Sequence, residues 1–162
     1  MSAGRTAAGI AIRAACPGEE SELTELALRS KAHWGHDAEF LARSRTALTV
    51  RPEHLERWIV QVAERQGAVV GVAAVDPEAA ELELLFVEPA AIGTGVGRAL
   101  LRDALDRARA AGLDELTIES DPDAEPFYLA QGAEQLGTRV SSATGRELPL
   151  LRIGTRDPDR SS

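Results

Sequence analysis

The stretch VEPAAIGTGVGRALL, from Val87 to Leu101, decides the fold, because it joins the end of a β-like run to the start of an amphipathic helix. It places three glycines, Gly93, Gly95 and Gly97, between a proline and that helix. Glycine permits positive φ and close approach of a ligand, and the first turn of a helix presents backbone N–H groups without intrahelical partners. Such a loop is typical of an anion site, and it favours phosphate.

The segments on either side of the loop predict its context. Three β-rich runs precede it, WIVQVAER, AVVGVAAVD and ELELLFV, and their short links predict an antiparallel meander, because parallel neighbours need a dozen or more connecting residues. After the loop come a helix that ends at Gly112, the strand LDELTIES, the short helix PDAEPFYLAQG and a closing hairpin. An early strand at GIAIRAA and three helical stretches between Gly18 and Trp58 complete the pattern.

Composition limits the organisation and the partners. The length of 162 residues and the 44% hydrophobic content fit one domain over residues 1–154, followed by a disordered tail over 155–162. Cys16 is the single cysteine, which excludes an internal disulfide and a cysteine-rich metal site and indicates a reducing, cytoplasmic location. No window is long and apolar enough to span a bilayer, so we expect no membrane partner. The net charge of −8 disfavours nucleic acid and leans toward a small cationic substrate.

Several uses of the glycine loop compete. A P-loop needs a lysine directly after its last glycine, but that position holds Arg98 and the single lysine is Lys31, which excludes an ordinary nucleoside triphosphatase. A dinucleotide site needs the spacing G-x-G-x-x-G at the start of a βαβ unit, whereas this loop contains G-T-G-V-G after the third strand of a meander. Glycines that only ease a turn and pack a helix on a sheet are the remaining alternative.

A second motif changes the balance between these alternatives. PFYLAQGA, from Pro126 to Ala133, follows the loop after roughly 30 residues that contain one predicted helix and one predicted strand. Together, LLFVEPAAIGTGVGRALL and PFYLAQGA resemble two linked motifs of the GNAT superfamily of N-acetyltransferases. In that family a strand ending in L-x-V leads into [Q/R]-G-x-G-x-[G/A], and F-Y-x-x-x-G-F lies downstream.

The resemblance implies both a fold and an activity. The fold is a single α+β (mixed α/β) domain with a central, mostly antiparallel sheet of six to seven strands, flanked by about four helices and splayed at the coenzyme site. The activity is transfer of an acetyl group from acetyl-CoA to the primary amine of a small molecule, by direct attack on the thioester and without a metal. A homodimer is possible, because dimers are frequent in the family.

The resemblance also assigns the coenzyme site. The expected coenzyme-binding residues are Leu85, Phe86, Val87, Ile92, Gly93, Thr94, Gly95, Val96, Gly97, Arg98 and Phe127. Ile92 departs from the family pattern, which has Gln or Arg at this place, so pyrophosphate binding would rest on backbone amides and Arg98. The departure keeps open an alternative function, a non-catalytic acyl-CoA-binding or sensing module.

Catalytic and acceptor-binding candidates follow from the same resemblance. Tyr128, the single tyrosine, lies where family enzymes place the general acid, and a phenol is protonated at neutral pH. Glu81 and Glu83 are the candidate bases, because a spacing of two places both on one face of a strand. The segment RSKAHWGHDAEF lies where the family's first two helices border the acceptor pocket. Its candidate substrate-binding residues are His33, Trp34, His36 and Asp37.

Overall fold

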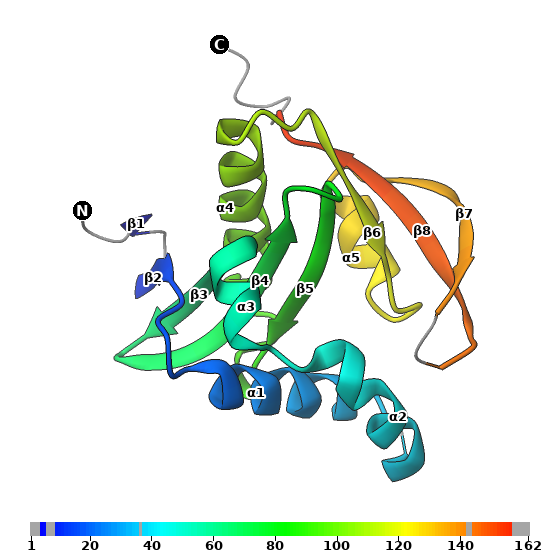
Figure 1. Ribbon diagram of the computed structural model, residues 1–162, viewed down its shortest axis with the longest axis horizontal. Helices are drawn as coiled ribbons and strands as arrows, with labels where there is room; N and C mark the ends of the chain where they lie inside the picture. Colours follow the sequence, from blue (N-terminus) through cyan, green and yellow to red (C-terminus); the bar gives the residue numbers. More distant parts are fainter. Residues whose placement is uncertain (1–3, 6–8, 36, 142–143, 157–162) are drawn as a thin grey trace.

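A computed structural model describes residues 4–5, 9–35, 37–141 and 144–156 of the chain (Figure 1). Over these residues one mixed sheet of eight strands has the order β1-β2-β3-β4-β5-β6-β8-β7, and β5 with β6 is its single parallel pair. The strands are β1 (Gly4–Arg5), β2 (Ile10–Ala14), β3 (Ile59–Arg65), β4 (Ala68–Asp76), β5 (Glu81–Val87), β6 (Glu115–Glu119), β7 (Glu134–Val140) and β8 (Glu147–Gly154). The count exceeds the expected six to seven because the two-residue strand β1 pairs with the edge of β2.

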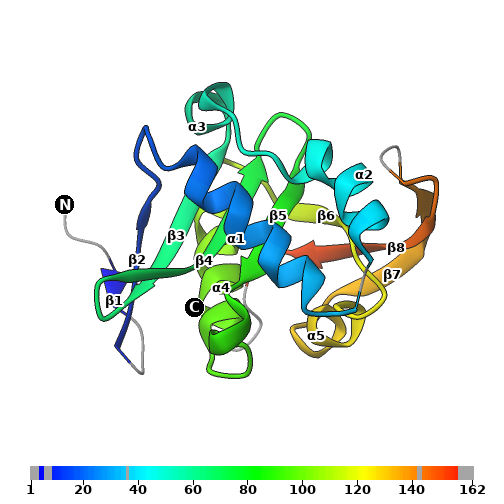
Figure 2. The ribbon, with the colours of Figure 1, turned by 90° about the horizontal axis from the view of Figure 1, so that it is seen from below.

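Helices cover both faces of this sheet (Figures 1 and 2). In the described part of the chain they are α1 (Glu20–Ala32), α2 (Ala38–Leu48), α3 (Pro52–Arg57), the 3₁₀ helix η2 (Pro89–Ala91), α4 (Val96–Ala110) and α5 (Glu125–Ala130). The alternation of β4 separates two hydrophobic clusters. Val72 and Ala74 pack in the cluster that contains the buried side of α1, whereas Ala73 and Val75 pack in the cluster that contains α4. The expected mixed α/β fold is confirmed, with α3 raising the helix count to five α-helices.

Local chemistry explains the borders of several elements. The hairpin between β3 and β4 turns at Gln66 and Gly67, both at positive φ, as the primed two-residue hairpin turns require. Asp37 accepts a hydrogen bond from the backbone N–H of Phe40 and so caps the N-terminus of α2. At the C-terminal end of α4, Gly112 has a φ of +92° and ends the helix. The predicted meander β3-β4-β5 is present, because each of these strands pairs antiparallel with the next.

The sheet is splayed between β5 and β6. These strands pair through two positions alone, Glu81 with Thr117 and Leu82 with Ile118, and then diverge. The pairing of β4 with β5 also shifts register, because Ala74 lies opposite Leu84 and Val75 lies opposite Leu82. Glu83 is the residue left without a partner on β4, so it forms a β-bulge where the two strands begin to part. The expected splaying is confirmed.

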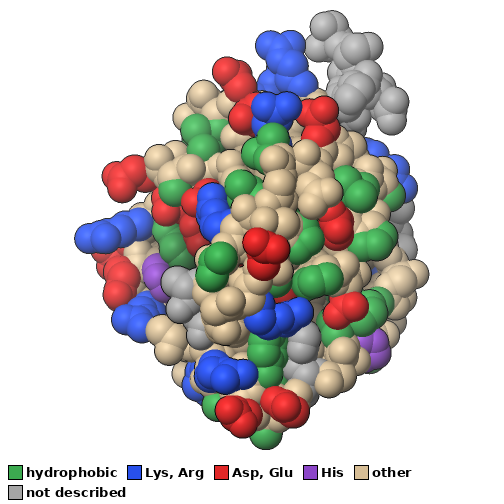
Figure 3. Space-filling model, turned by 90° about the vertical axis from the view of Figure 1, so that its right-hand side faces the viewer, with side chains coloured by type: hydrophobic (Ala, Val, Ile, Leu, Met, Phe, Trp, Pro, Cys, Tyr) green, Lys and Arg blue, Asp and Glu red, His purple; other side chains and the backbone are tan. Residues whose placement is uncertain are grey.

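The outer edge and the chain end complete the fold. The edge strand β7 exposes Leu136 and Val140. Figure 3 shows acidic, basic and apolar side chains mixed over one side of the molecule. Thr155, expected in the tail, is buried and bonds through its backbone N–H to the carbonyl oxygen of Asp114. The rest of the expected tail, 157–162, lies outside the described residues. No helix in the described segments is long and apolar enough to cross a membrane.

Candidate functional site

The glycine loop, residues 92–95, connects η2 to the N-terminus of α4. Gly93 and Gly95 have φ of +83° and +94°, and Gly95 is the N-cap residue of the helix. A Cβ added at either glycine would meet nothing within 4 Å, so the loop is open to an approaching molecule. The backbone N–H groups of Gly93, Gly95, Val96, Gly97 and Arg98 have no acceptor among the described residues. Unpaired N–H groups at the positive end of a helix fit the phosphates of a nucleotide-containing molecule.

The end of β3 holds this loop in place. Arg65 donates from Nη1 to the hydroxyl of Thr94 at 3.1 Å and from Nη2 to its carbonyl oxygen at 3.3 Å. The Thr94 hydroxyl in turn donates to the carbonyl oxygen of Ala91. The side chain of Thr94, an expected coenzyme residue, is therefore used within the protein. Sequence reasoning missed Arg65, because no local pattern connects a hairpin end to a loop 29 residues later.

Three elements meet where the loop enters α4. A Cβ at Gly97 would lie 3.6 Å from Val87 at the end of β5 and 3.6 Å from Phe127 in α5. The expected coenzyme residues Val87, Gly97 and Phe127 are thus brought together by packing. Ile92 is half-buried and Arg98 is exposed, which leaves the guanidinium of Arg98 available beside the loop.

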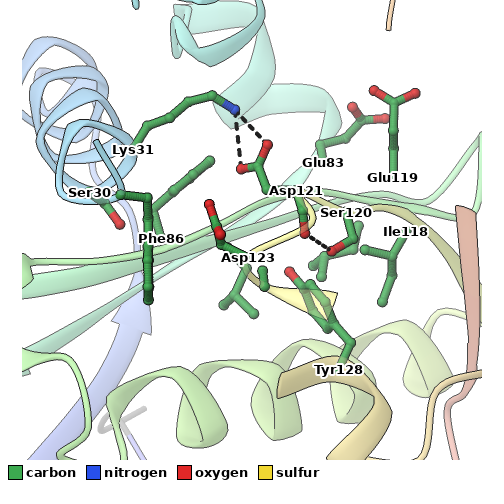
Figure 4. A pocket seen from close by; sticks show the side chains of 14 residues that line it. Ser30, Lys31, Glu83, Phe86, Ile118, Glu119, Ser120, Asp121, Asp123 and Tyr128 are labelled. Carbon is green, nitrogen blue, oxygen red and sulfur yellow. Dashed lines mark hydrogen bonds and ion pairs between the residues drawn. The ribbon is translucent and has the colours of Figure 1, made fainter. Parts of the chain in front are cut away.

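A small pocket lies where β5 and β6 diverge, and we call it the junction pocket. It encloses about 100 Å³ and is lined from α1, β5, β6, the segment after β6 and α5 (Figure 4). Leu85 and Phe86, both expected to bind the coenzyme, line it together with Glu83 and Tyr128. The pocket therefore joins the expected coenzyme strand to two of the expected catalytic residues.

Tyr128 comes from α5, and its ring is 6% exposed. Its hydroxyl points into the junction pocket and has no hydrogen-bond partner among the described residues (Figure 4). Burial, with a smaller contribution from the negative charge of Asp121, raises the pKa of Tyr128 above its usual value near 10. The phenol thus keeps its proton at neutral pH, in a position facing the pocket.

Glu83 sits at the bulge of β5 and lines both the junction pocket and a larger pocket beside it. Glu83 is exposed as a whole residue, but the pocket walls displace part of the water around its carboxylate, and the negative charges of Glu81, Asp76 and Glu119 add to this effect. Together they raise the pKa of Glu83 to about 7, against the partial opposition of Arg139. A carboxyl group with this pKa can accept a proton near neutral pH.

We call the larger neighbour the outer pocket. It encloses about 370 Å³ between α1, α2, β5 and the β7–β8 hairpin, and it shares Lys31, Glu83 and Phe86, among others, with the junction pocket. Glu81 also lines it, as expected from its spacing to Glu83, although the bulge interrupts the simple alternation of the strand. This volume falls in the range of small-molecule sites, about 300 to 1,000 Å³.

Ion pairs organise the walls of both pockets. Lys31 in α1 donates to both carboxylate oxygens of Asp121, at 2.9 and 3.1 Å, and so links α1 to the segment that follows β6. Arg139 of β7 bonds Glu81 at 3.2 Å and lies 3.8 Å from Glu119. Sequence reasoning missed Lys31, Asp121 and Arg139 as site residues, because their proximity depends on the order of strands in the sheet.

The expected substrate-binding residues have different fates. Trp34 lines the junction pocket, with 49% of its surface exposed. His33 makes an edge-to-face ring contact with Trp34, while neither it nor Asp37 lines either pocket. Asp37 is the N-cap of α2, and His36 lies outside the described residues. No group of three or more potential metal ligands occurs among the described His, Cys, Asp and Glu residues.

Comparisons with known proteins agree on one family. A model of the Acetyltransferase (GNAT) domain matches residues 35–146. An IAA acetyltransferase of Azospirillum brasilense is 46% identical over 63 residues, 36% of this chain and 41% of that protein. The N-alpha-acetyltransferase RimI of Mycobacterium tuberculosis is 32% identical over 105 residues, 59% of this chain and 66% of its own length. The structure of a GCN5-related N-acetyltransferase from Rhodopseudomonas palustris has a TM-score of 0.77 at 19% identity, covering 95% of this chain and 98% of that one.

Proposed function

Because the chain belongs to the GNAT acetyltransferase domain family, we propose that it is an acetyl-CoA-dependent N-acetyltransferase acting on the primary amine of a small molecule. The single observation that carries this proposal is the position of the junction pocket. It lies where β5 and β6 part, with the open glycine loop at the far end of β5 and Glu83 and Tyr128 in its walls. One molecule running from the loop along β5 would bring its reactive end to these two side chains.

The glycine loop would hold the coenzyme's pyrophosphate through the unpaired N–H groups at the start of α4, with Arg98 beside them. Beyond Leu82 the backbone of β5 lacks a strand partner on its β6 side. An extended arm of the coenzyme can hydrogen-bond there, as an added strand does. Leu85, Phe86 and Val87 would provide this edge.

Glu83 and Tyr128 divide the proton transfers. Glu83 would take a proton from the acceptor's ammonium group, which leaves a neutral amine with a free electron pair. The amine nitrogen then forms a bond to the thioester carbonyl carbon as the carbon–sulfur bond breaks. Tyr128 would donate its hydroxyl proton to the departing thiolate, and the phenolate would recover, through solvent, the second proton that the nitrogen loses as the amide forms. The products are an N-acetylated amine and free coenzyme A.

Calorimetry of acetyl-CoA binding tests the glycine loop directly. Gly95→Glu places a carboxylate among the N–H groups, and we expect affinity to fall at least about tenfold, the effect of roughly 1.4 kcal/mol. Gly95→Asn is the matched control, because Asn tolerates the same positive φ without a charge. Circular dichroism would verify that both variants are folded. Equal affinity of the two variants would contradict the assigned loop.

An amine screen with detection of released thiol would test turnover. Release with at least one amine supports the enzyme, whereas tight coenzyme binding without release on any amine would favour the alternative acyl-CoA-binding or sensing module. Absence of both would reject the proposed function. A cytoplasmic location and a homodimer stay predictions, checked by cell fractionation and by sedimentation.

A further inference from the structure

The charged groups of the outer pocket leave one group of each sign without an ion-pair partner. Lys31 is neutralised by Asp121, and Arg139 is shared between Glu81 and Glu119. Among the described residues, neither Glu83 nor Arg146 has an ion pair. Both line the outer pocket, Glu83 from β5 and Arg146 from the residue before β8.

The surroundings of Arg146 are suited to an anionic group. Its guanidinium lies 5.0 Å from the centre of the Phe40 ring, which fixes the planar group against a flat apolar surface. Ser44, in the next turn of α2, lines the same pocket. Ser44 is 3% exposed, and its buried hydroxyl oxygen has no hydrogen-bond partner among the described residues. A buried hydroxyl without a partner is costly, so a ligand oxygen that accepts its proton would be favoured.

The pocket also has an apolar part to its lining, to which Leu48, Phe86 and Leu148 contribute. A molecule that fits must therefore carry an amine, an apolar body and an anion. A polyamine would place a second positive charge beside Arg146, where like charges repel.

We propose that the acceptor is an amino acid, whose carboxylate binds Arg146 and Ser44 while its amine faces Glu83. This inference rests on the proposed acetyltransfer at Glu83 and names the substrate class. A guanidinium pairs bidentately with a carboxylate, which gives geometric specificity as well as affinity. An amino acid satisfies both unpaired groups, whereas the small cation expected from net charge satisfies just one of them.

Turnover on matched acceptors tests the proposal. The probes are phenylalanine, its amide and phenethylamine, which share the amine and the apolar body but differ in the carboxylate, together with phosphoethanolamine as a phosphate-bearing amine. For the wild type we expect kcat/KM to be about 10- to 100-fold higher for the amino acid than for the amide or phenethylamine, which lack the carboxylate; this is the range for a charge-assisted hydrogen bond. In Arg146→Gln this preference should disappear, and in Arg146→Lys it should persist in part. Arg109→Gln, on the exposed side of α4, is the control and should keep it.

A binding measurement separates this proposal from the acetyltransfer on which it rests. N-acetylphenylalanine and N-acetylphenethylamine would be titrated into the wild type and Arg146→Gln in the presence of coenzyme A. Tighter binding of the carboxylate, lost in Arg146→Gln, supports the inference even if no acceptor turns over, in which case the acetyltransfer alone has failed. Equal or better use of the amide, the amine or phosphoethanolamine by the wild type overturns it. So does an unchanged preference in Arg146→Gln.

Discussion

At the scale of single residues, Glu83 links the bulge to the pH dependence of catalysis. Its pKa of about 7 in the ligand-free protein predicts that kcat/KM rises as the pH is raised through 7 and then levels, because the ionised carboxylate is the form that accepts a proton. Glu83→Gln should remove this inflection and lower kcat about 100-fold. The rates should be measured with an amine whose own pKa lies well above 8, so that the two ionisations separate.

The same variant has a stability signature that can be checked without substrate. The pKa of Glu83 is raised in the folded chain from 4.5, so the folded state binds more protons than the unfolded state between about pH 4.5 and 7. Its contribution to stability is therefore present below that window and is lost as the pH rises through it. Glu83→Gln should be more stable than the wild type at pH 8, with Glu56→Gln on the exposed side of α3 as the control. An unchanged pH profile of kcat/KM together with unchanged stability would show that Glu83 is an ordinary carboxylate.

Tyr128 presents the complementary test of the acid. Tyr128→Phe removes a hydroxyl that bonds no described residue and keeps the buried ring, so the fold should be unaffected. We expect kcat to fall about 100-fold, within the usual range for a general acid, while acetyl-CoA binding by calorimetry stays within a factor of two or so. A variant that turns over like the wild type would assign the thiolate's proton to water instead.

At the scale of elements, β4 and α4 approach closely at Gly71. A Cβ there would lie 2.7 Å from Cδ1 of Leu100, 3.0 Å from Cγ1 of Val96 and 3.2 Å from the carbonyl oxygen of Phe86. Gly71→Ala should lower the free energy of unfolding by about 1–3 kcal/mol, because an added methyl overpacks the contact. Urea unfolding would measure this against Gly154→Ala, whose Cβ would have 4.0 Å to its nearest neighbour. Equal midpoints for the two variants would contradict the tight contact.

The ends of several elements were predictable from the sequence, because a glycine marks them. Positive φ is needed at three places: the turn at Gln66 and Gly67, the glycine loop and the end of α4 at Gly112. In each place a glycine in the sequence indicates it. The insertion of β8 between β6 and β7 was not predicted, because hydrogen bonds between distant strands leave no local pattern. The bulge at Glu83 was hidden for a related reason. The alternation in ELELLFV is regular, and the irregularity arises in its pairing with β4.

At the scale of the whole molecule, the candidate site draws on segments from both ends of the chain. The motif around Tyr128 and the glycine loop could be found in the sequence, because each is a local pattern. Arg139 and Arg146 could not, since they reach the outer pocket through the pairing of β7 and β8. Net charge carries no information on this local arrangement, for the same reason. A total of −8 does not reveal that one cation in the pocket lacks a carboxylate partner.

The short parallel contact between β5 and β6 also has a mechanical meaning. Strands β1 to β5 form one part of the sheet, and β6, β8 and β7 form the other. The backbones of the two parts are joined by two residue pairs between β5 and β6. The ion pair between Lys31 of α1 and Asp121 after β6 is a further link between the helix and the second part of the sheet. A sheet bends most easily where the fewest hydrogen bonds resist it. We therefore expect any rotation of the two parts of the sheet to take place about the short β5–β6 pairing. We therefore expect the gap between β5 and β6 to be the part of the sheet whose width changes most easily, so that a slender extended chain could enter it without rearranging either part.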